Sequence, residues 1–150
     1  MFEPWTIETK TGGPYRVYSP FKRACFDRED SIGEPVPAPD DLPAPDTWPD
    51  SEALNDWALG AAMNRGGEIV AQYANVGEAA ALERLEDFVG IVADYDDGRN
   101  MLAKTGTSML SENYAWGEIS TRTAWHRIRS YMARSTKPDL GATVYLQELL

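Results

Sequence analysis

Apolar residues between positions 82 and 95 recur at intervals of three and four, a spacing that places them on one face of an α-helix. This stripe is formed by Leu82, Leu85, Val89 and Val92, flanked by Phe88 and Tyr95. Charged residues occupy the other side: Glu83, Arg84, Glu86 and Asp87. Gly98 follows as a stop signal, because glycine readily adopts the left-handed conformation found at many helix ends. The pattern predicts one amphipathic helix that packs on a core.

The same pattern predicts further helices towards the C-terminus. A short helix is expected near 108–114, after a loop that carries Thr105 and Gly106. Ser120 is a favourable N-cap for the next helix, and Pro138-Asp139 opens the last one. The apolar positions of these two helices are Ala124, Trp125, Ile128, Tyr131 and Met132, and then Leu140, Val144, Leu149 and Leu150. The chain is therefore expected to be mainly α-helical.

The first residues follow a different pattern. Turn residues at 11–14 precede the β-branched and aromatic run Tyr15-Arg16-Val17-Tyr18, which predicts a strand. Ser19 is placed to cap a short helix with Pro20 at its first position. The strand needs a partner, either a hairpin with residues 5–9 or a larger sheet whose earlier strands are missing. Together with an uncapped apolar end at Leu149-Leu150, this leads us to expect a piece of a larger protein.

A proline-rich segment separates these two parts. Residues 31–60 hold six of the ten prolines, interleaved with acidic residues. Proline removes a backbone donor and disfavours helix in the residue before it, so this segment is expected to run extended, close to polyproline II. We interpret it as a linker that crosses between domains.

The composition is that of a globular chain without membrane or metal chemistry. The chain has 150 residues, 43% of them hydrophobic, and fits one modest domain. No apolar run is long enough for a membrane helix, and the N-terminus does not resemble a signal peptide. The single Cys25 fits a reducing cytosol and is interpreted as a small buried group. His126 is the only histidine and is interpreted as a packing or surface residue, so no metal site is expected.

The net charge of −10 is unevenly distributed along the chain. Residues 27–60 carry −9, whereas residues 101–150 carry +2. Five of the basic residues of this last part lie close together in the sequence: Arg122, Arg127, Arg129, Arg134 and Lys137. Such a patch favours DNA through counterion release, but a solvated helix face is the preferred interpretation of the segment taken alone.

The clearest candidate site is the run from Gly106 to Ser120. Thr107, Ser108 and Ser111 follow a glycine closely and lie between two helical patterns. Small hydroxyls and free backbone N–H groups at a helix start favour a phosphate, because the unpaired donors and the helix dipole both attract an anion. The alternative is that Ser108 and Ser111 merely cap a short helix.

Several motifs, in this order and at these spacings, resemble the flavin-dependent class I DNA photolyases and their cryptochrome relatives over nearly the whole chain. The motifs lie at 2–4, 13–21, 42–46, 77–85, 106–111 and 117–120, followed by Trp125-His126. The stretch from 106 to 120 is the most specific of them. The resemblance implies that residues 1–27 are the C-terminal strand–helix remnant of an α/β antenna domain, that residues 28–76 are an interdomain linker, and that residues 77–150 are the first helices of the FAD-binding domain.

The resemblance also implies site residues, with FAD as the cofactor. Contacts with the flavin cofactor are implied for Tyr95, Thr107, Ser108, Met109, Leu110, Ser111 and Tyr145. Glu148 matches an acidic residue that lies near the pyrimidine dimer. The family normally has tryptophan where Tyr145 stands, and tyrosine keeps an aromatic face but adds a hydroxyl.

The implied function is the repair of cyclobutane pyrimidine dimers by light-driven electron transfer from the flavin. No catalytic acid–base pair is expected, because the cofactor supplies the chemistry. UV-damaged DNA would be the partner of a monomeric, cytoplasmic full-length protein with an antenna pigment that is not specified. Further site residues would lie beyond this chain, so the chain alone is expected to be inactive. The alternatives are a cryptochrome-like blue-light signalling protein, which Tyr145 slightly favours, and a truncated helical protein without a cofactor.

Overall fold

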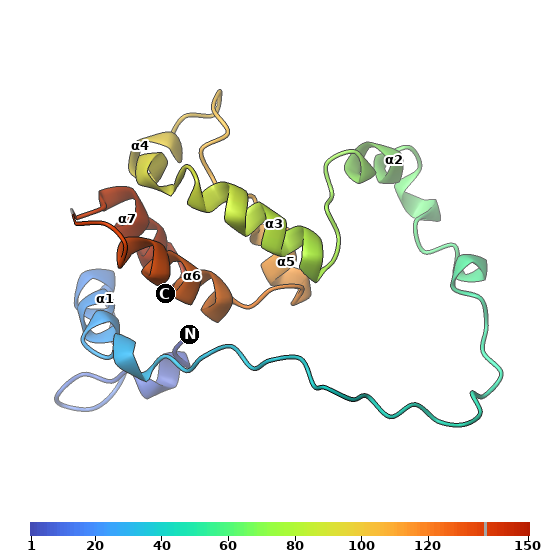
Figure 1. The fold of residues 1–150 in the computed structure, drawn as a ribbon, viewed down its shortest axis with the longest axis horizontal. Coiled ribbons are helices and arrows are strands. Elements are labelled where there is room, and N and C mark those ends of the chain that lie inside the picture. Colours follow the sequence, from blue (N-terminus) through green and yellow to red (C-terminus); the bar gives the residue numbers. More distant parts are fainter. Residues whose placement is uncertain (137) are drawn as a thin grey trace. The chain divides into compact units, whose positions relative to one another are not determined.

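The computed structural model describes residues 1–136 and 138–150. The chain divides into two compact units, one formed by Met1–Pro35 with Val76–Leu150 and the other by Val36–Asn75. Helices account for most of the regular structure in both units (Figure 1). Among the described residues, the β-structure consists of one isolated antiparallel bridge. The prediction of a mainly α-helical chain is confirmed.

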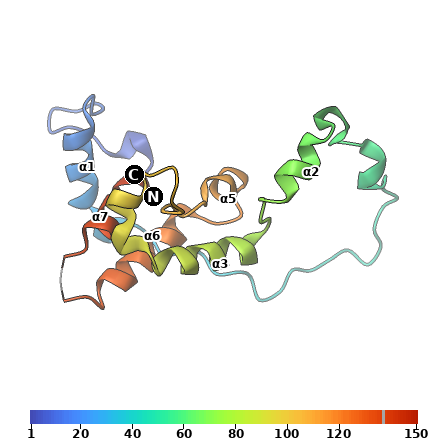
Figure 2. The same ribbon diagram turned by 90° about the horizontal axis from the view of Figure 1, so that it is seen from above.

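The first unit holds most of the helices. Its α-helices are α1 (Tyr18–Phe26), α3 (Glu78–Val89), α4 (Tyr95–Gly98), α5 (Ser111–Trp116), α6 (Thr121–Met132) and α7 (Leu140–Glu148). Its 3₁₀ turns are η1 (Pro4–Thr6), η2 (Glu29–Ser31) and η5 (Val92–Asp94). Helix α1 comes from the start of the chain but contacts the C-terminal end of α7, where the Tyr18 hydroxyl donates to the Gln147 carbonyl at 2.7 Å (Figure 2).

Two helices begin where the sequence predicts. Ser120 is the N-cap of α6, and its hydroxyl accepts from the Thr123 N–H at 3.1 Å. Asp139 is the N-cap of α7, and its carboxylate accepts from the Ala142 N–H at 2.8 Å. Each cap satisfies a backbone donor that has no partner within its helix. Both starts follow from local chemistry, which explains why they can be recognised in the sequence.

The core lies between α3, α6 and α7. Trp125 is only 2% exposed, and its ring lies 5.7 Å from that of Phe26, which ends α1. The other large side chains that are almost fully buried in this cluster are Leu85, Leu110, Ile128, Leu146 and Val92. Burial of such side chains contributes roughly 1.5–3 kcal/mol each and is the main force that holds these short helices together.

The predicted faces of two helices were partly wrong. In α3, Leu82 remains 40% exposed while Phe88 is 2% exposed. The prediction assumed one continuous helix with its stop at Gly98, whereas α3 ends at Val89 and the chain turns before it resumes helical structure. In α7, Leu140 is 64% exposed, and the buried residues are Gly141, Ala142, Tyr145 and Leu146. Contact with η5 determines which face of α7 is buried, and helical spacing alone does not reveal that contact.

The predicted strand at 15–18 is also wrong. Tyr18 is the first residue of α1 and Val17 is its N-cap, so Ser19 lies inside the helix and caps nothing. A strand at this place needs a partner for its backbone, and the described residues supply none. Pro20 is tolerated in the first turn, where its missing N–H would have no partner within the helix.

The hairpin alternative survives only as a single bridge. Glu8 and Pro14 form an isolated antiparallel pair, and the Thr9 N–H donates to the Gly13 carbonyl at 2.9 Å. Gly12 and Gly13 have φ values of 83° and 88°, a conformation that favours glycine. The turn residues were therefore recognised correctly, but the strand they were expected to introduce is absent.

The second unit, Val36–Asn75, contains η3 (Leu54–Trp57), η4 (Ala61–Met63) and α2 (Gly66–Ala71). Its proline-rich first half has no helix, in agreement with the extended conformation predicted for it. None of its residues is buried, and Trp48 is 75% exposed. The assignment of 28–76 as an interdomain linker, and of the flanking segments as parts of two domains, stays a prediction.

Candidate functional site

A groove runs between α3 and the segment at 105–109, which we call the hydroxyl segment. It has a volume of about 360 Å³. Its lining residues are Arg84, Asp87, Phe88, Ile91, Thr105, Thr107, Ser108 and Met109. The groove thus combines apolar side chains, hydroxyl groups and one residue of each charge. Such a mixture is typical of sites for organic ligands with polar substituents.

A backbone contact fixes the start of the hydroxyl segment. A Cβ atom added to Gly106 would lie 2.7 Å from the carbonyl carbon and oxygen of Gly98, so no side chain fits at this crossing. The two glycines therefore close the loop between them by direct backbone approach. A second hollow of about 380 Å³ shares Ile91 and Thr105 with the groove, and its other lining residues include Asp94, Asp97 and Lys104.

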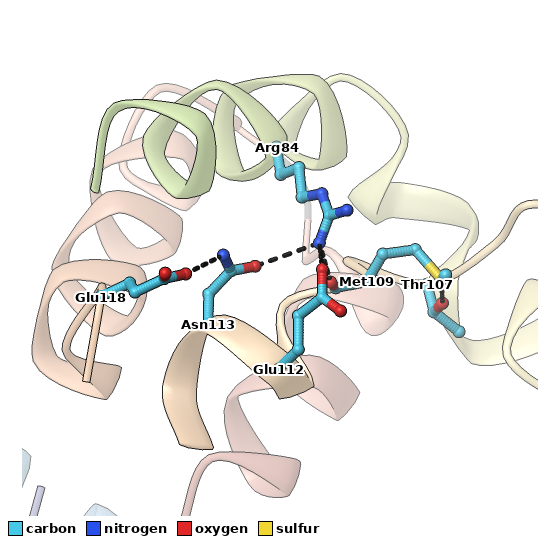
Figure 3. A network of polar contacts seen from close by, with 6 residues as sticks. All are labelled: Arg84, Thr107, Met109, Glu112, Asn113 and Glu118. Carbon is cyan, nitrogen blue, oxygen red and sulfur yellow. Dashed lines mark hydrogen bonds and ion pairs between the residues drawn. The ribbon is translucent and has the colours of Figure 1, made fainter. Parts of the chain in front are cut away.

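Arg84 holds the end of the hydroxyl segment against α3 (Figure 3). Its Nη1 atom donates to the Met109 carbonyl at 2.9 Å, to Glu112 at 2.5 Å and to the Asn113 side-chain oxygen at 3.1 Å. The Asn113 amide nitrogen in turn donates to Glu118 at 2.7 Å. Asn113 is fully buried, and these contacts satisfy polar groups that would otherwise be costly to bury.

The segment places its predicted site residues in different surroundings. Thr107, Ser108 and Met109 line the groove, and the Thr107 hydroxyl lies 3.4 Å from the Met109 sulfur. Leu110 is fully buried in the core, and Ser111 is an exposed residue at the start of α5. The N-cap of α5 is Leu110 with no side-chain cap. Neither Ser108 nor Ser111 therefore acts as the side-chain cap that the alternative interpretation required.

Tyr95 and Tyr145 meet in an aromatic cluster behind the groove. Their ring centroids lie 5.3 Å apart, and Phe88 contacts both, at 5.5 Å from Tyr95 and 4.5 Å from Tyr145. Both tyrosines are buried, and neither lines the groove. The Tyr145 hydroxyl pairs with that of Tyr114 at 3.0 Å, so this hydroxyl has a partner within the protein. Burial raises the pKa of both Tyr95 and Tyr114, which keeps these phenols protonated.

Glu148 lies at the end of α7 and is paired with Arg99 at 2.5 Å. The Arg99 guanidinium carbon also lies 5.5 Å from the centre of the Tyr95 ring, within the range of a cation–π contact. The hydrogen bond to Glu148 raises the pKa of Arg99, which keeps the guanidinium charged. Tyr95 and Glu148, which the sequence could not place relative to each other, are thus joined through one arginine.

Two of the five basic residues named in the last part of the chain form ion pairs within the protein. Arg127 pairs with Glu86 of α3, and Arg129 pairs with Glu29 at 2.8 Å. The pairing lowers the pKa of Glu86 through its hydrogen bond with Arg127. Surface pairs of this kind are weak, so the preference for a helix face over a DNA-binding patch stays a prediction. Lys137, also assigned to the patch, lies outside the described residues.

Cys25 and His126 lie in the surroundings predicted for them. Cys25 is fully buried, as predicted, and burial raises the pKa of its thiol. His126 packs at the surface, with its Nε2 atom 3.1 Å from the Gly33 carbonyl oxygen. Within 1–136 and 138–150, no group of three or more potential metal ligands comes together. Over the same residues, no helix is both long and apolar enough to cross a membrane.

The sequence missed three residues that organise the site. Arg84 appeared only as part of a polar helix face and Phe88 only as a flank of the apolar stripe, and Arg99 was given no role. The acceptors of Arg84 lie 25 to 29 residues further along the chain. No periodic signal reports such a distant contact. An arginine and a phenylalanine four residues apart on α3 do share one face, and this was the available hint.

Comparisons with known proteins identify relatives along almost the whole chain. It is 38% identical over 142 residues to the deoxyribodipyrimidine photo-lyase of Agrobacterium fabrum, a match that covers 94% of this chain and 29% of the relative. It is 35% identical over 139 residues to the deoxyribodipyrimidine photo-lyase of Halobacterium salinarum, covering 91% of this chain and 28% of the relative. The chain therefore spans less than a third of the length of these relatives. No family model matches it.

A solved structure is similar in both sequence and fold. The crystal structure of a bacterial class III photolyase from Agrobacterium tumefaciens superposes with a TM-score of 0.83 at 36% identity, covering 99% of this chain and 30% of the other. The named relatives support a photolyase and give no support for a cryptochrome in its place. The narrower assignment to class I stays a prediction.

Proposed function

Because the chain belongs to the photolyase family and spans less than a third of its relatives, we propose that it forms one wall of the FAD pocket of a DNA photolyase. The whole protein would repair cyclobutane pyrimidine dimers in UV-damaged DNA. The single observation that carries this proposal is the groove, in which Thr107 and Ser108 lie opposite the apolar side chains of α3.

The groove residues fit part of such a cofactor. FAD has a polar diphosphate and ribityl region joined to a flat ring system. The hydroxyls of Thr107 and Ser108 can donate to phosphate or ribityl oxygens, whereas Phe88 and Ile91 offer apolar surface. The negatively charged Asp87 carboxylate would repel the phosphates of the cofactor. We therefore expect the phosphates to lie on the hydroxyl side of the groove and away from α3.

The other residues implied by the family support this wall in different ways. Tyr95, Tyr145 and Leu110 are buried and would shape the pocket from behind. Ser111 is exposed at the start of α5, where it can meet another part of the protein. Glu148 would face the dimer, held by Arg99.

FAD, when bound, supplies the light-driven electron that splits the dimer. The residues of this chain bind and orient it, and none serves as a catalytic acid or base. We propose that the chain alone does not repair DNA, because it accounts for 29% of the length of its Agrobacterium relative. The full protein would act as a cytoplasmic monomer; its antenna pigment is left unspecified.

The test is FAD binding to the purified chain, measured by quenching of flavin fluorescence. We expect saturable binding that weakens by about thirtyfold in the double variant Thr107→Val/Ser108→Ala, since the two lost hydrogen bonds contribute about 1 kcal/mol each. Ser130→Ala, on the exposed side of α6, is the matched control and should bind like the unmodified chain. Binding that is unaffected by the double variant would refute the proposed role of these hydroxyls, and light-driven repair by the chain alone would refute its inactivity.

A further inference from the structure

One nitrogen atom of Arg84 lies within hydrogen-bond distance of three acceptors. Nη1 carries two hydrogens, yet the Met109 carbonyl, Glu112 and Asn113 all lie within 3.1 Å of it (Figure 3). The three acceptors belong to one short stretch that includes the end of the hydroxyl segment and the first turns of α5. One guanidinium nitrogen of α3 thus contacts both the end of the hydroxyl segment and the first turn of α5.

Of the three Arg84 contacts, the hydrogen bond to the Met109 carbonyl affects the groove most. Met109 has a φ of 53°, a left-handed conformation that is unfavourable for residues other than glycine. Such a conformation persists where the surrounding contacts impose it. The Arg84 donor binds the carbonyl of this residue, and the adjacent Thr107 and Ser108 line the groove. Fixing this carbonyl thus fixes the direction from which the hydroxyls approach.

The charge of Arg84 is already matched within the protein. Its side chain is only 14% exposed, and Glu112 lies 2.5 Å from it. On the side away from the groove, the buried Asn113 side chain accepts from Arg84 and donates to Glu118. An arginine held in this way contributes geometry more than free charge to a ligand.

We propose that Arg84 is the positioning residue of the groove, which sets the hydroxyl segment in the conformation that receives a phosphate or ribityl group. This rests on the proposed function for the nature of the ligand but not for the effect on the segment. Arg84 acts through Met109 and the segment and is not itself a catalytic residue.

The test compares Arg84→Met with Arg127→Met by two measurements on the full chain. Arg127→Met also removes an ion pair that joins α3 to another helix, but neither Arg127 nor Glu86 lines the groove. In the absence of ligand, we expect hydrogen exchange of the backbone amides at 105–110 to rise about tenfold in Arg84→Met relative to the control. With FAD as the probe, we expect affinity to fall about tenfold, and Arg84→Lys to restore part of both effects.

The variant Glu112→Gln distinguishes the effect of the Arg84–Met109 hydrogen bond from that of the Arg84–Glu112 ion pair. It removes one charge and leaves the Met109 contact, so exchange at 105–110 should stay within about twofold of the unmodified chain. Equal exchange in Arg84→Met and Arg127→Met would overturn the proposal, as would a larger effect from Glu112→Gln than from Arg84→Met. If the unmodified chain fails to bind FAD while Arg84→Met still loosens the segment, the proposed cofactor is wrong and the positioning role stands.

Discussion

Replacing Gly141 by alanine tests how α7 is seated. A Cβ atom at this position would lie 2.2 Å from the Val92 carbonyl oxygen and 2.4 Å from that of Ala93. Ordinary contacts of a Cβ atom begin at 3.4 Å, so α7 and η5 would have to separate by about 1.2 Å. The obstructing atoms belong to the backbone and cannot rotate away as a side chain could.

The expected cost follows from two opposing effects. Overpacking of this kind costs typically about 1–3 kcal/mol, and the rigid obstruction favours the upper end of that range. Alanine has a better helix propensity than glycine by about 1 kcal/mol, which offsets part of the cost. We therefore expect Gly141→Ala to lower the free energy of unfolding by about 2 kcal/mol.

Urea unfolding followed by tryptophan fluorescence measures this change. Trp125 is 2% exposed, whereas Trp5, Trp48 and Trp116 are 74%, 75% and 83% exposed, so the spectral shift reports mainly on the core. Gly90→Ala is the matched control, because its Cβ would approach only one carbonyl oxygen, at 3.2 Å. A midpoint for Gly141→Ala that equals or exceeds that of the unmodified chain would refute the reasoning.

Ser120→Ala removes the N-cap acceptor of α6 and should lower the free energy of unfolding by about 1 kcal/mol in a urea titration; an unchanged midpoint would contradict the cap. Tyr145→Phe removes the hydroxyl paired with Tyr114 and should cost about 1 kcal/mol in the same assay, whereas a gain in stability would show that the pair is not favourable. The raised pKa values of Tyr95 and Tyr114 also predict a pH dependence. Their stabilising contribution is fully present below pH 10.0, the ordinary tyrosine pKa, and is lost as the pH rises through their folded-state values. Urea midpoints measured at increasing pH should therefore fall above about pH 10, and fall less when both residues are phenylalanine.

The parts of the fold that the sequence predicted are those determined locally. Ser120 and Asp139 cap helices through hydrogen bonds to residues three positions away, so their effect is visible in a short window. The strand at 15–18 was wrong because a strand depends on a partner elsewhere, and its β-branched and aromatic residues express only a weak preference. The buried face of α7 was missed for a similar reason, since a backbone contact at Gly141 selects it.

In the candidate site, too, features that depend on residues close in sequence differ from those that depend on long-range contacts. Thr107 and Ser108 are adjacent in sequence, and their small hydroxyls after a glycine predict a phosphate site; the structure places both in the lining of one groove, and their role as ligands stays a prediction. The pairing of Arg99 with Glu148 spans 49 residues, and the bond from Arg84 to Asn113 spans 29. Long-range polar contacts have no periodic signature, and a charged residue on a helix is usually solvated. Only coordinates could show which arginines of this chain organise the site.

Phe88 connects the two halves of the candidate site. Phe88 lines the groove, and its ring also packs against the rings of Tyr95 and Tyr145. Tyr145 comes from α7, whose position depends on Gly141, and α7 also carries Glu148. A displacement of α7 is therefore expected to reach the groove through the packed rings, because close-packed interiors transmit such shifts instead of absorbing them. On this argument, the groove wall and the end of α7 are parts of one packed unit, although Thr107 and Glu148 share no direct contact among the described residues.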